Sequence, residues 1–230
     1  MEENNNNQLK HYTSVSTLYK ILAKGFMFQD GKSWNDKNDR YTLQKYREYV
    51  YPKNVLVLCF CDGAGNVYHW AALGKIDPND SDSQIKCSIV LNKDTFLKHI
   101  DSIVGMSHRE MMYCKNNKVA EHQMEDLPYL KRKEFSVEKE YRIIYTGDKS
   151  EFFLSDIIPY IDKIVIGLCT EAEFDEIKQH IVTAFNIDEA KITQNLLNGS
   201  KEWNDNVDII VQHAEQAKKD KCNPEVINIF

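Results

Sequence analysis

The 230-residue sequence contains no apolar run that approaches the ~20 residues needed to cross a bilayer. Its first eight residues contain neither the basic start nor the apolar stretch of a secretory signal. No internal repeat is visible. We therefore expect a cytoplasmic protein that makes no contact with a membrane.

A metal centre is not indicated either. The six cysteines are scattered and lie mostly inside apolar runs, which is typical of reduced, buried thiols. Cys59 and Cys61 are spaced like half of a metal site, but no second Cys or His pair at ligand spacing completes it. The sequence therefore predicts free thiols and no bound metal.

The charge also gives no general attraction to polyanions. The net charge is −6, which does not favour nucleic acid or an anionic membrane, although a local basic patch is compatible with it. Hydrophobic residues make up 42% and charged residues 28%, which is ordinary for a globular protein. The length favours one large domain, or one domain with an appendage.

Residues 1–8 are polar and low in complexity, which predicts disorder. Apolar or alternating segments predict strands at 9–13, 54–60, 85–91, 161–167 and 190–197. Helices are predicted after Ser14 up to a stop at Gly25, over 41–50 and 94–103, after the capping box Thr170–Glu173, and over 203–219. Strands outnumber long helices without regular alternation, so the class is α+β. We expect one domain over 9–200 and a C-terminal helical extension over 201–230.

The segment from Phe135 to Tyr145 carries the most chemical information. β-branched and aromatic residues dominate it, and a turn at Gly147 closes it, so it predicts a strand. Alternation along a strand would place Glu138, Glu140 and Arg142 on one face. By itself this pattern is also what a solvated strand face with a weak ion pair would show.

Three further motifs give this segment a context. His11-Tyr12-Thr13-Ser14, Trp34-Asn35-Asp36, Cys59-Phe60 with Trp70 downstream, and Glu138-Lys139-Glu140-Tyr141-Arg142 follow one another along the chain. This series resembles a large bacterial domain-of-unknown-function family with His-Tyr-Thr/Ser, Phe-Asn-Asp-Pro, Cys-Phe-Ser, a Trp followed by Tyr-Ala, and Glu-Lys-Glu-Tyr-Arg motifs. The likeness spans roughly residues 9–197. Lys37 and Cys61 replace the Pro and Ser of the pattern, and Tyr-Ala is missing after Trp70.

That family in turn resembles the ADP-ribosyltransferase superfamily, including its DNA-modifying toxin branch. The resemblance implies a split, mostly antiparallel sheet with flanking helices and a central cleft that binds NAD as a substrate. It implies that Glu140 is the catalytic glutamate, that Glu138 is an accessory carboxylate toward the acceptor, and that His11 hydrogen-bonds the adenosine ribose. The other residues that it implies for cofactor binding are Tyr12, Thr13, Asn35, Asp36 and Arg142.

The chemistry of the reaction fits these residue types. Breaking the bond between nicotinamide and ribose builds positive charge on the sugar, and a fixed carboxylate stabilises that transition state more than the ground state. A second carboxylate nearby could orient or deprotonate an acceptor. Arg142 would keep both carboxylates ionised, because a neighbouring cation lowers a carboxylate pKa.

Several alternatives remain open from the sequence. Water in place of an acceptor would make the protein an NAD glycohydrolase, and a degenerate site would make it a nucleotide- or protein-binding module without activity. The acceptor, protein or nucleic acid, is not readable. A toxin or anti-phage effector would have an antitoxin or another regulatory protein as its partner. Lys131-Arg132-Lys133 could contact phosphates, but a short basic cluster is usually solvated.

Overall fold

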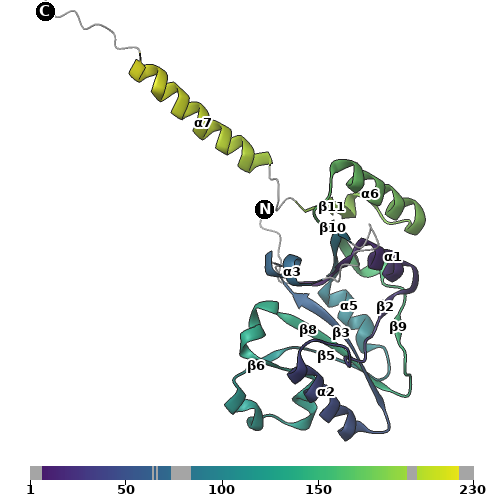
Figure 1. Ribbon diagram of the computed structural model, residues 1–230. Helices are drawn as coiled ribbons and strands as arrows, with labels where there is room; N and C mark the ends of the chain where they lie inside the picture. Colours follow the sequence, from purple (N-terminus) through teal and green to yellow (C-terminus); the bar gives the residue numbers. More distant parts are fainter. Residues whose placement is uncertain (1–6, 64, 66, 74–83, 196–200, 223–230) are drawn as a thin grey trace, which may run out of the picture. The chain divides into compact units, whose positions relative to one another are not determined.

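The computed structural model describes residues 7–63, 65, 67–73, 84–195 and 201–222 (Figure 1). The chain divides into two compact units, Met1–Gln194 and Asn195–Phe230. The described residues of the second unit include the helix α7 (Lys201–Cys222). Of the predicted disordered segment, residues 1–6 lie outside the described residues, whereas Gln8 already belongs to the first strand. No helix within the described ranges is long and apolar enough to span a membrane.

A mostly antiparallel sheet forms the centre of the first unit. Its strands in spatial order are β11 (Ile192–Gln194), β10 (Ile161–Ile166), β4 (Lys86–Asn92), β1 (Gln8–Ser14), β3 (Asn54–Asp62), β8 (Glu140–Gly147) and β5 (Met106–Glu110). Neighbours are antiparallel except for β10 and β11, which are parallel. The predicted α+β class is confirmed.

The pairing between β1 and β3 is incomplete. Strand β1 pairs with β4 from Gln8 to Ser14, and β3 pairs with β8 from Asn54 to Cys61. In the described residues, however, β1 and β3 pair only at Leu9–Asp62 and Lys10–Cys61. Beyond that point their backbones part, so the sheet has a split between the half that contains β1 and the half that contains β3.

The larger hydrophobic core packs helices α1 (Val15–Lys24), α5 (Lys93–Asp101) and α6 (Glu171–Phe185) against the sheet. Helix α1 has the predicted buried stripe, Val15, Leu18, Ile21 and Leu22, and it ends at Gly25, whose φ of 91° favours glycine. The predicted capping box opens α6, with Thr170 and Glu173 each bonding the other's backbone N–H.

The other face of β3 and β8 packs against helix α2 (Lys37–Val50), where Leu43, Val55, Val57 and Ile144 form a smaller core. The remaining elements are α3 (Val67–Ala72), the pairs β2 (Phe26–Met27) with β9 (Phe153–Leu154) and β6 (Met112–Cys114) with β7 (Leu130–Arg132), and the 3₁₀ helices η2 (Asn116–Glu121), η3 (Met124–Tyr129), η4 (Lys133–Glu138), η5 (Ile158–Tyr160) and η6 (Glu189–Lys191).

Candidate active site

The predicted strand over 135–145 is wrong in its first half. Strand β8 begins at Glu140, residues Lys133–Glu138 form η4, and Lys139 between them is left-handed, with φ 44°. A left-handed residue turns the chain, so strand alternation does not relate Glu138 to Glu140. The His69 imidazole hydrogen-bonds the Glu138 carbonyl through Nε2, at 2.9 Å, and this contact helps to fix the turn.

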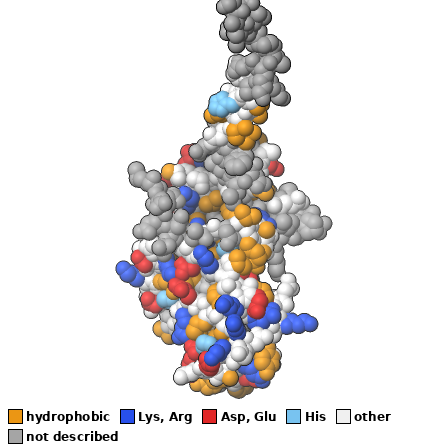
Figure 2. Space-filling model, turned by 90° about the vertical axis from the view of Figure 1, so that its left-hand side faces the viewer, with side chains coloured by type: hydrophobic (Ala, Val, Ile, Leu, Met, Phe, Trp, Pro, Cys, Tyr) orange, Lys and Arg blue, Asp and Glu red, His pale blue; other side chains and the backbone are white. Residues whose placement is uncertain are grey.

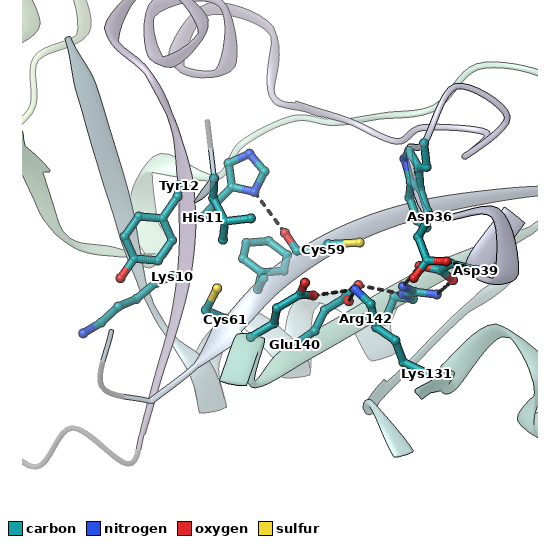
Figure 3. Close-up of a pocket in the computed structure, with 14 residues that line it drawn as sticks. Lys10, His11, Tyr12, Asp36, Asp39, Cys59, Cys61, Lys131, Glu140 and Arg142 are labelled. Atoms are coloured by element: carbon teal, nitrogen blue, oxygen red, sulfur yellow. Dashed lines mark hydrogen bonds and ion pairs between the residues drawn. The ribbon is translucent and has the colours of Figure 1, made fainter. Parts of the chain in front are cut away.

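Sheet register places the polar side chains of three strands in rows. Lys10 pairs with Cys61, which pairs with Glu140, and Cys59 pairs with Arg142. Directly paired residues face the same side of a sheet, so these side chains share one face of the sheet, next to the split. A cavity of about 320 Å³ opens there (Figure 3). Its lining consists of Lys10, His11, Tyr12, Trp34, Asp36, Asp39, Cys59, Phe60, Cys61, Leu73, Lys131, Glu138, Glu140 and Arg142.

Most of the residues singled out in the sequence lie around this cavity. The predicted catalytic residues Glu138 and Glu140 line it together with His11, Tyr12, Asp36 and Arg142. Two are placed elsewhere. Thr13 is buried in the ladder opposite Cys87, and Asn35 is exposed in the loop before α2.

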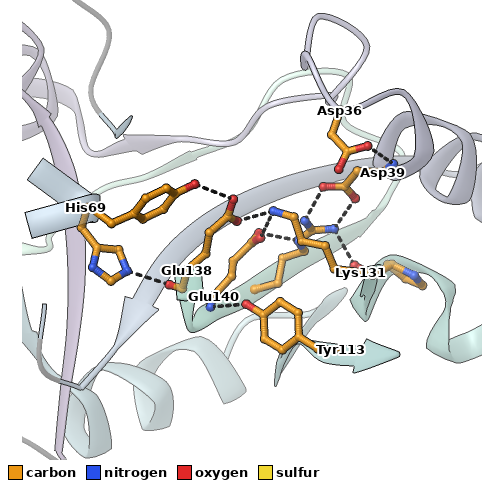
Figure 4. Close-up of polar contacts among 10 residues, drawn as sticks. Asp36, Asp39, His69, Tyr113, Lys131, Glu138 and Glu140 are labelled. Atoms are coloured by element: carbon orange, nitrogen blue, oxygen red, sulfur yellow. Dashed lines mark hydrogen bonds and ion pairs between the residues drawn. The ribbon is translucent and has the colours of Figure 1, made fainter. Parts of the chain in front are cut away.

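Glu140 is a buried carboxylate between two cations. Arg142 Nε donates to its Oε1 at 2.8 Å and Lys131 Nζ to its Oε2 at 2.8 Å (Figure 4). Burial opposes ionisation, but Arg142 and Lys131 outweigh it and lower the pKa of Glu140 to about 2. Its backbone N–H donates to the Tyr113 hydroxyl at 2.7 Å. Glu140 therefore keeps its negative charge and a fixed position at physiological pH.

Arg142 holds the Glu140 carboxylate in place from inside the core. Its side chain is fully buried, and its Nη atoms donate to both Asp39 oxygens at 2.9 and 2.7 Å and to the Pro128 carbonyl at 2.8 Å. The Trp34 ring lies over the guanidinium at 5.0 Å. The resemblance assigned Arg142 to cofactor binding, whereas its hydrogen bonds are directed to protein groups. Arg142 is a positioning residue for Glu140.

Lys131 joins the two candidate catalytic glutamates. Its ammonium is hydrogen-bonded to Glu138 as well as to Glu140, and its side chain is only 10% exposed. The expectation that the basic cluster 131–133 is solvated is therefore wrong for Lys131. With Asp39 and Arg142, the cluster contains three carboxylates and two cations. It therefore keeps one net negative charge beside the cavity.

His11 reaches across the split from the opposite wall. Its Nδ1 lies 3.0 Å from the Cys59 carbonyl oxygen, which can only accept, so Nδ1 carries a proton. Burial lowers the pKa of His11 and keeps the ring neutral. Its Nε2 then has a lone pair that can accept a hydrogen bond from a ligand hydroxyl.

Tyr12 and Asp36 complete two walls of the cavity. The Tyr12 ring stacks on His69 at 5.4 Å and meets Trp70 edge-on at 5.3 Å, so helix α3 fixes its orientation. Asp36 is the N-cap of α2 and accepts from the backbone N–H groups of Asn38 and Asp39. This cap orients the first turn of α2, which carries Asp39 toward Arg142.

A second cavity, of about 470 Å³, extends from the first toward α1 and β2. The two cavities share His11, Trp34 and Cys59. The two cavities are therefore neighbours, and the carboxylates of Glu138 and Glu140 line the first of them. Within the described ranges, no group of three or more His, Cys, Asp or Glu side chains is arranged to hold a metal ion.

The chain matches no model of a known protein family and no curated protein.

Proposed function

We propose that the protein is an NAD-dependent ADP-ribosyltransferase that binds NAD along the split in the sheet. One observation carries the proposal: an ionised, immobilised carboxylate, Glu140, lines the same cavity as the neutral His11 on the opposite wall. The aromatic rings of Tyr12, Trp34 and Phe60 in the lining suit the flat rings of a dinucleotide.

In the proposed reaction, an acceptor oxygen or nitrogen forms a bond to the ribosyl C1′ as the bond from C1′ to the nicotinamide nitrogen breaks. The bonding electrons leave with nicotinamide and neutralise its ring, and the acceptor proton passes to a base or to water. The ribose carries positive charge in the transition state. Glu140 stabilises that charge from a site that burial keeps at low dielectric, which strengthens the interaction relative to water.

The surrounding ions support this role for Glu140. Two cations beside a catalytic carboxylate would cancel its field if they were themselves unpaired. Here the charge of Arg142 is balanced by Asp39, and Lys131 forms ion pairs with both Glu138 and Glu140. The excess negative charge of the cluster is therefore retained. The cluster is thus suited to stabilise a cation.

Incubation of the full-length protein with NAD tests the proposal. We expect nicotinamide release, followed by chromatography, and transfer of label from adenine-labelled NAD to macromolecules of a cell lysate. A folded protein that neither releases nicotinamide nor labels any macromolecule would contradict the proposal.

The alternative, NAD glycohydrolase activity with water as acceptor, has one observation in its favour. The Glu138 carboxylate already accepts from Lys131 and from the Tyr68 hydroxyl, at 3.3 Å in the latter case. A carboxylate engaged in this way is a weaker base toward an acceptor than a free one. Separate measurement of free ADP-ribose and of labelled macromolecules distinguishes the two activities.

Glu138→Gln is expected to reduce transfer to an acceptor about tenfold or more, and to reduce NAD hydrolysis less, because general-base assistance typically contributes ~10²–10⁴-fold. Glu140 keeps its contacts with Arg142 and Lys131 in this variant. Parallel rates of ADP-ribose release and macromolecule labelling provide the measurement. Glu134→Gln, an exposed residue of the same 3₁₀ helix, is the matched control. Equal losses in both reactions would show that Glu138 acts only through Glu140.

A further inference from the structure

A basic hollow of about 490 Å³ lies on the outer side of helix α2. It is lined by Lys32, Lys37, Arg40, Tyr41, Gln44 and Arg47. Four of these six residues are cations, and among the described residues none of the lining is a carboxylate. This concentration of positive charge stands out in a chain whose net charge is −6. Figure 2 shows one face of the molecule, on which basic and acidic side chains are intermixed.

The hollow follows from the helical repeat. Lys37, Arg40, Gln44 and Arg47 follow one another at intervals of three or four residues, and so do Lys37, Tyr41 and Gln44, so their side chains share one face of α2. Asp39 and Leu43 lie on the inner side and are buried. One helix thus positions Arg142 through Asp39 on its inner side and presents cations on its outer side.

The charges in the hollow are only partly compensated. Lys32 forms an exposed ion pair with Asp30, at 3.2 Å. Arg47, however, donates to the backbone carbonyls of Asp30 and Val55, and Arg40 to the carbonyl of Lys32, at 3.4 Å. Carbonyl groups orient a guanidinium without neutralising it. The Asp30 carboxylate interacts electrostatically with Arg47 as well as with Lys32, so this single acidic group is shared between two of the four cations.

Shared lining residues link the hollow to the candidate active site by way of a third cavity. Tyr41, 61% exposed, lines both the hollow and an intermediate cavity of about 350 Å³. That cavity shares Asp36, Asp39 and Lys131 with the cavity that contains Glu140. Its lining also includes the amide side chains of Asn38 and Asn116 and the guanidinium of Arg132.

We propose that a nucleic-acid strand is the acceptor, with its phosphates bound in the basic hollow and a base directed through the intermediate cavity toward Glu140. The inference rests on the proposed transferase function. An exposed tyrosine among cations suits a stacked base beside its phosphates, and side-chain amides suit the polar edge of a base. An acidic peptide would satisfy the cations but would leave the ring and the amides without a matched partner.

The chemistry of the step is that of the proposed function. A ring or exocyclic nitrogen of the base, or a hydroxyl oxygen of the strand, bonds to the ribosyl C1′ and loses a proton to Glu138 or to water. Nicotinamide leaves with the electron pair of the broken bond. No oxidant, reductant or further reactant is needed.

Binding of fluorescein-labelled single-stranded DNA and RNA oligonucleotides of about 15 nucleotides tests the proposal, by anisotropy in the absence of NAD. We expect at least one of them to bind, with a slope of log affinity against log salt of about −3 if each of the four cations contacts one phosphate. Lys37→Gln/Arg40→Gln should reduce that slope to about −1.4 and weaken binding at least tenfold. Tyr41→Ala should weaken oligonucleotide binding about tenfold but leave binding of inorganic polyphosphate unchanged.

Lys98→Gln/Lys149→Gln, which removes two exposed cations outside the hollow, is the matched control and should bind as the wild type does. The proposal is overturned if neither oligonucleotide binds, if both double variants lose affinity equally, or if polyglutamate or phosphatidylserine vesicles bind as well as the oligonucleotides do.

Nicotinamide release by the wild type without any acceptor is measured separately. A protein that releases nicotinamide but binds no oligonucleotide would refute the acceptor and retain the proposed function. Binding without nicotinamide release, in the absence and in the presence of the oligonucleotide, would refute the function and the acceptor role with it, and would leave only a nucleic-acid-binding surface.

Discussion

Glu140→Gln is expected to lower nicotinamide release by on the order of 10²–10³-fold, the usual cost of removing one preorganised electrostatic partner of a transition state. The amide keeps nearly the same shape and still accepts from Arg142, but it lacks the charge that opposes the developing ribosyl cation. Initial rates of nicotinamide release at saturating NAD give the measurement.

This variant needs a test of folding, because the substitution also leaves Arg142 and Lys131 with less negative charge in a buried site. Thermal unfolding and NAD affinity should therefore be measured on the same preparation. Glu110→Gln, on the exposed edge strand β5, is the matched control and should keep its activity. A folded Glu140→Gln protein with unaltered turnover would rule out the catalytic role.

Arg142→Met is expected to lower the free energy of unfolding by about 3–5 kcal/mol, because it leaves the buried carboxylates of Asp39 and Glu140 without their shared cation. For a chain of this size, such a loss lowers the melting temperature by roughly 6–20 °C. Calorimetry or circular dichroism during heating measures the effect. Activity should fall as well, since Arg142 holds Glu140 in place.

Arg109→Met provides the comparison for this loss. Arg109 also pairs with a carboxylate, Asp126, at 2.7 Å, but its side chain is 48% exposed. Exposed ion pairs contribute only ~0–1 kcal/mol, so this variant should melt close to the wild type. Similar melting temperatures for the two variants would mean that the Arg142 cluster does not stabilise the fold.

The parts of the fold that local chemistry determines could be predicted from the sequence. The apolar run 54–60 lies within β3, and the Thr170–Glu173 pair caps α6, because both signals act within a few residues. Strand β5 could not be predicted. Its sequence, Met106 to Glu110, is largely polar, and the partner that orders it, β8, lies about thirty residues further along the chain.

The candidate site likewise contains residues that could be predicted from the sequence and residues that could not. Glu140 stands out in the sequence because it belongs to the motif Glu138-Lys139-Glu140-Tyr141-Arg142. Asp39 has no such local signal, because only the N-cap at Asp36 and the remote Arg142 make it a buried helical carboxylate. The sequence around Lys131 is typical of a solvated basic cluster. Lys131 is nevertheless paired, because the turn at the left-handed Lys139 places the Glu138 carboxylate next to its ammonium. Such long-range pairings have no periodic signal in one sequence.

The short ladder between β1 and β3 gives the two walls of the split different freedom to change during evolution. Side chains on β1 are held in place through β4, whereas Glu140 and Arg142 are held through β3 and β8. Among the described residues, strands β1 and β3 pair only at Leu9 and Lys10. Substitutions on the β1 wall can therefore alter which part of a ligand is recognised without disturbing the ladder that carries the carboxylate. The recognition wall and the reactive wall can diversify almost independently within one domain.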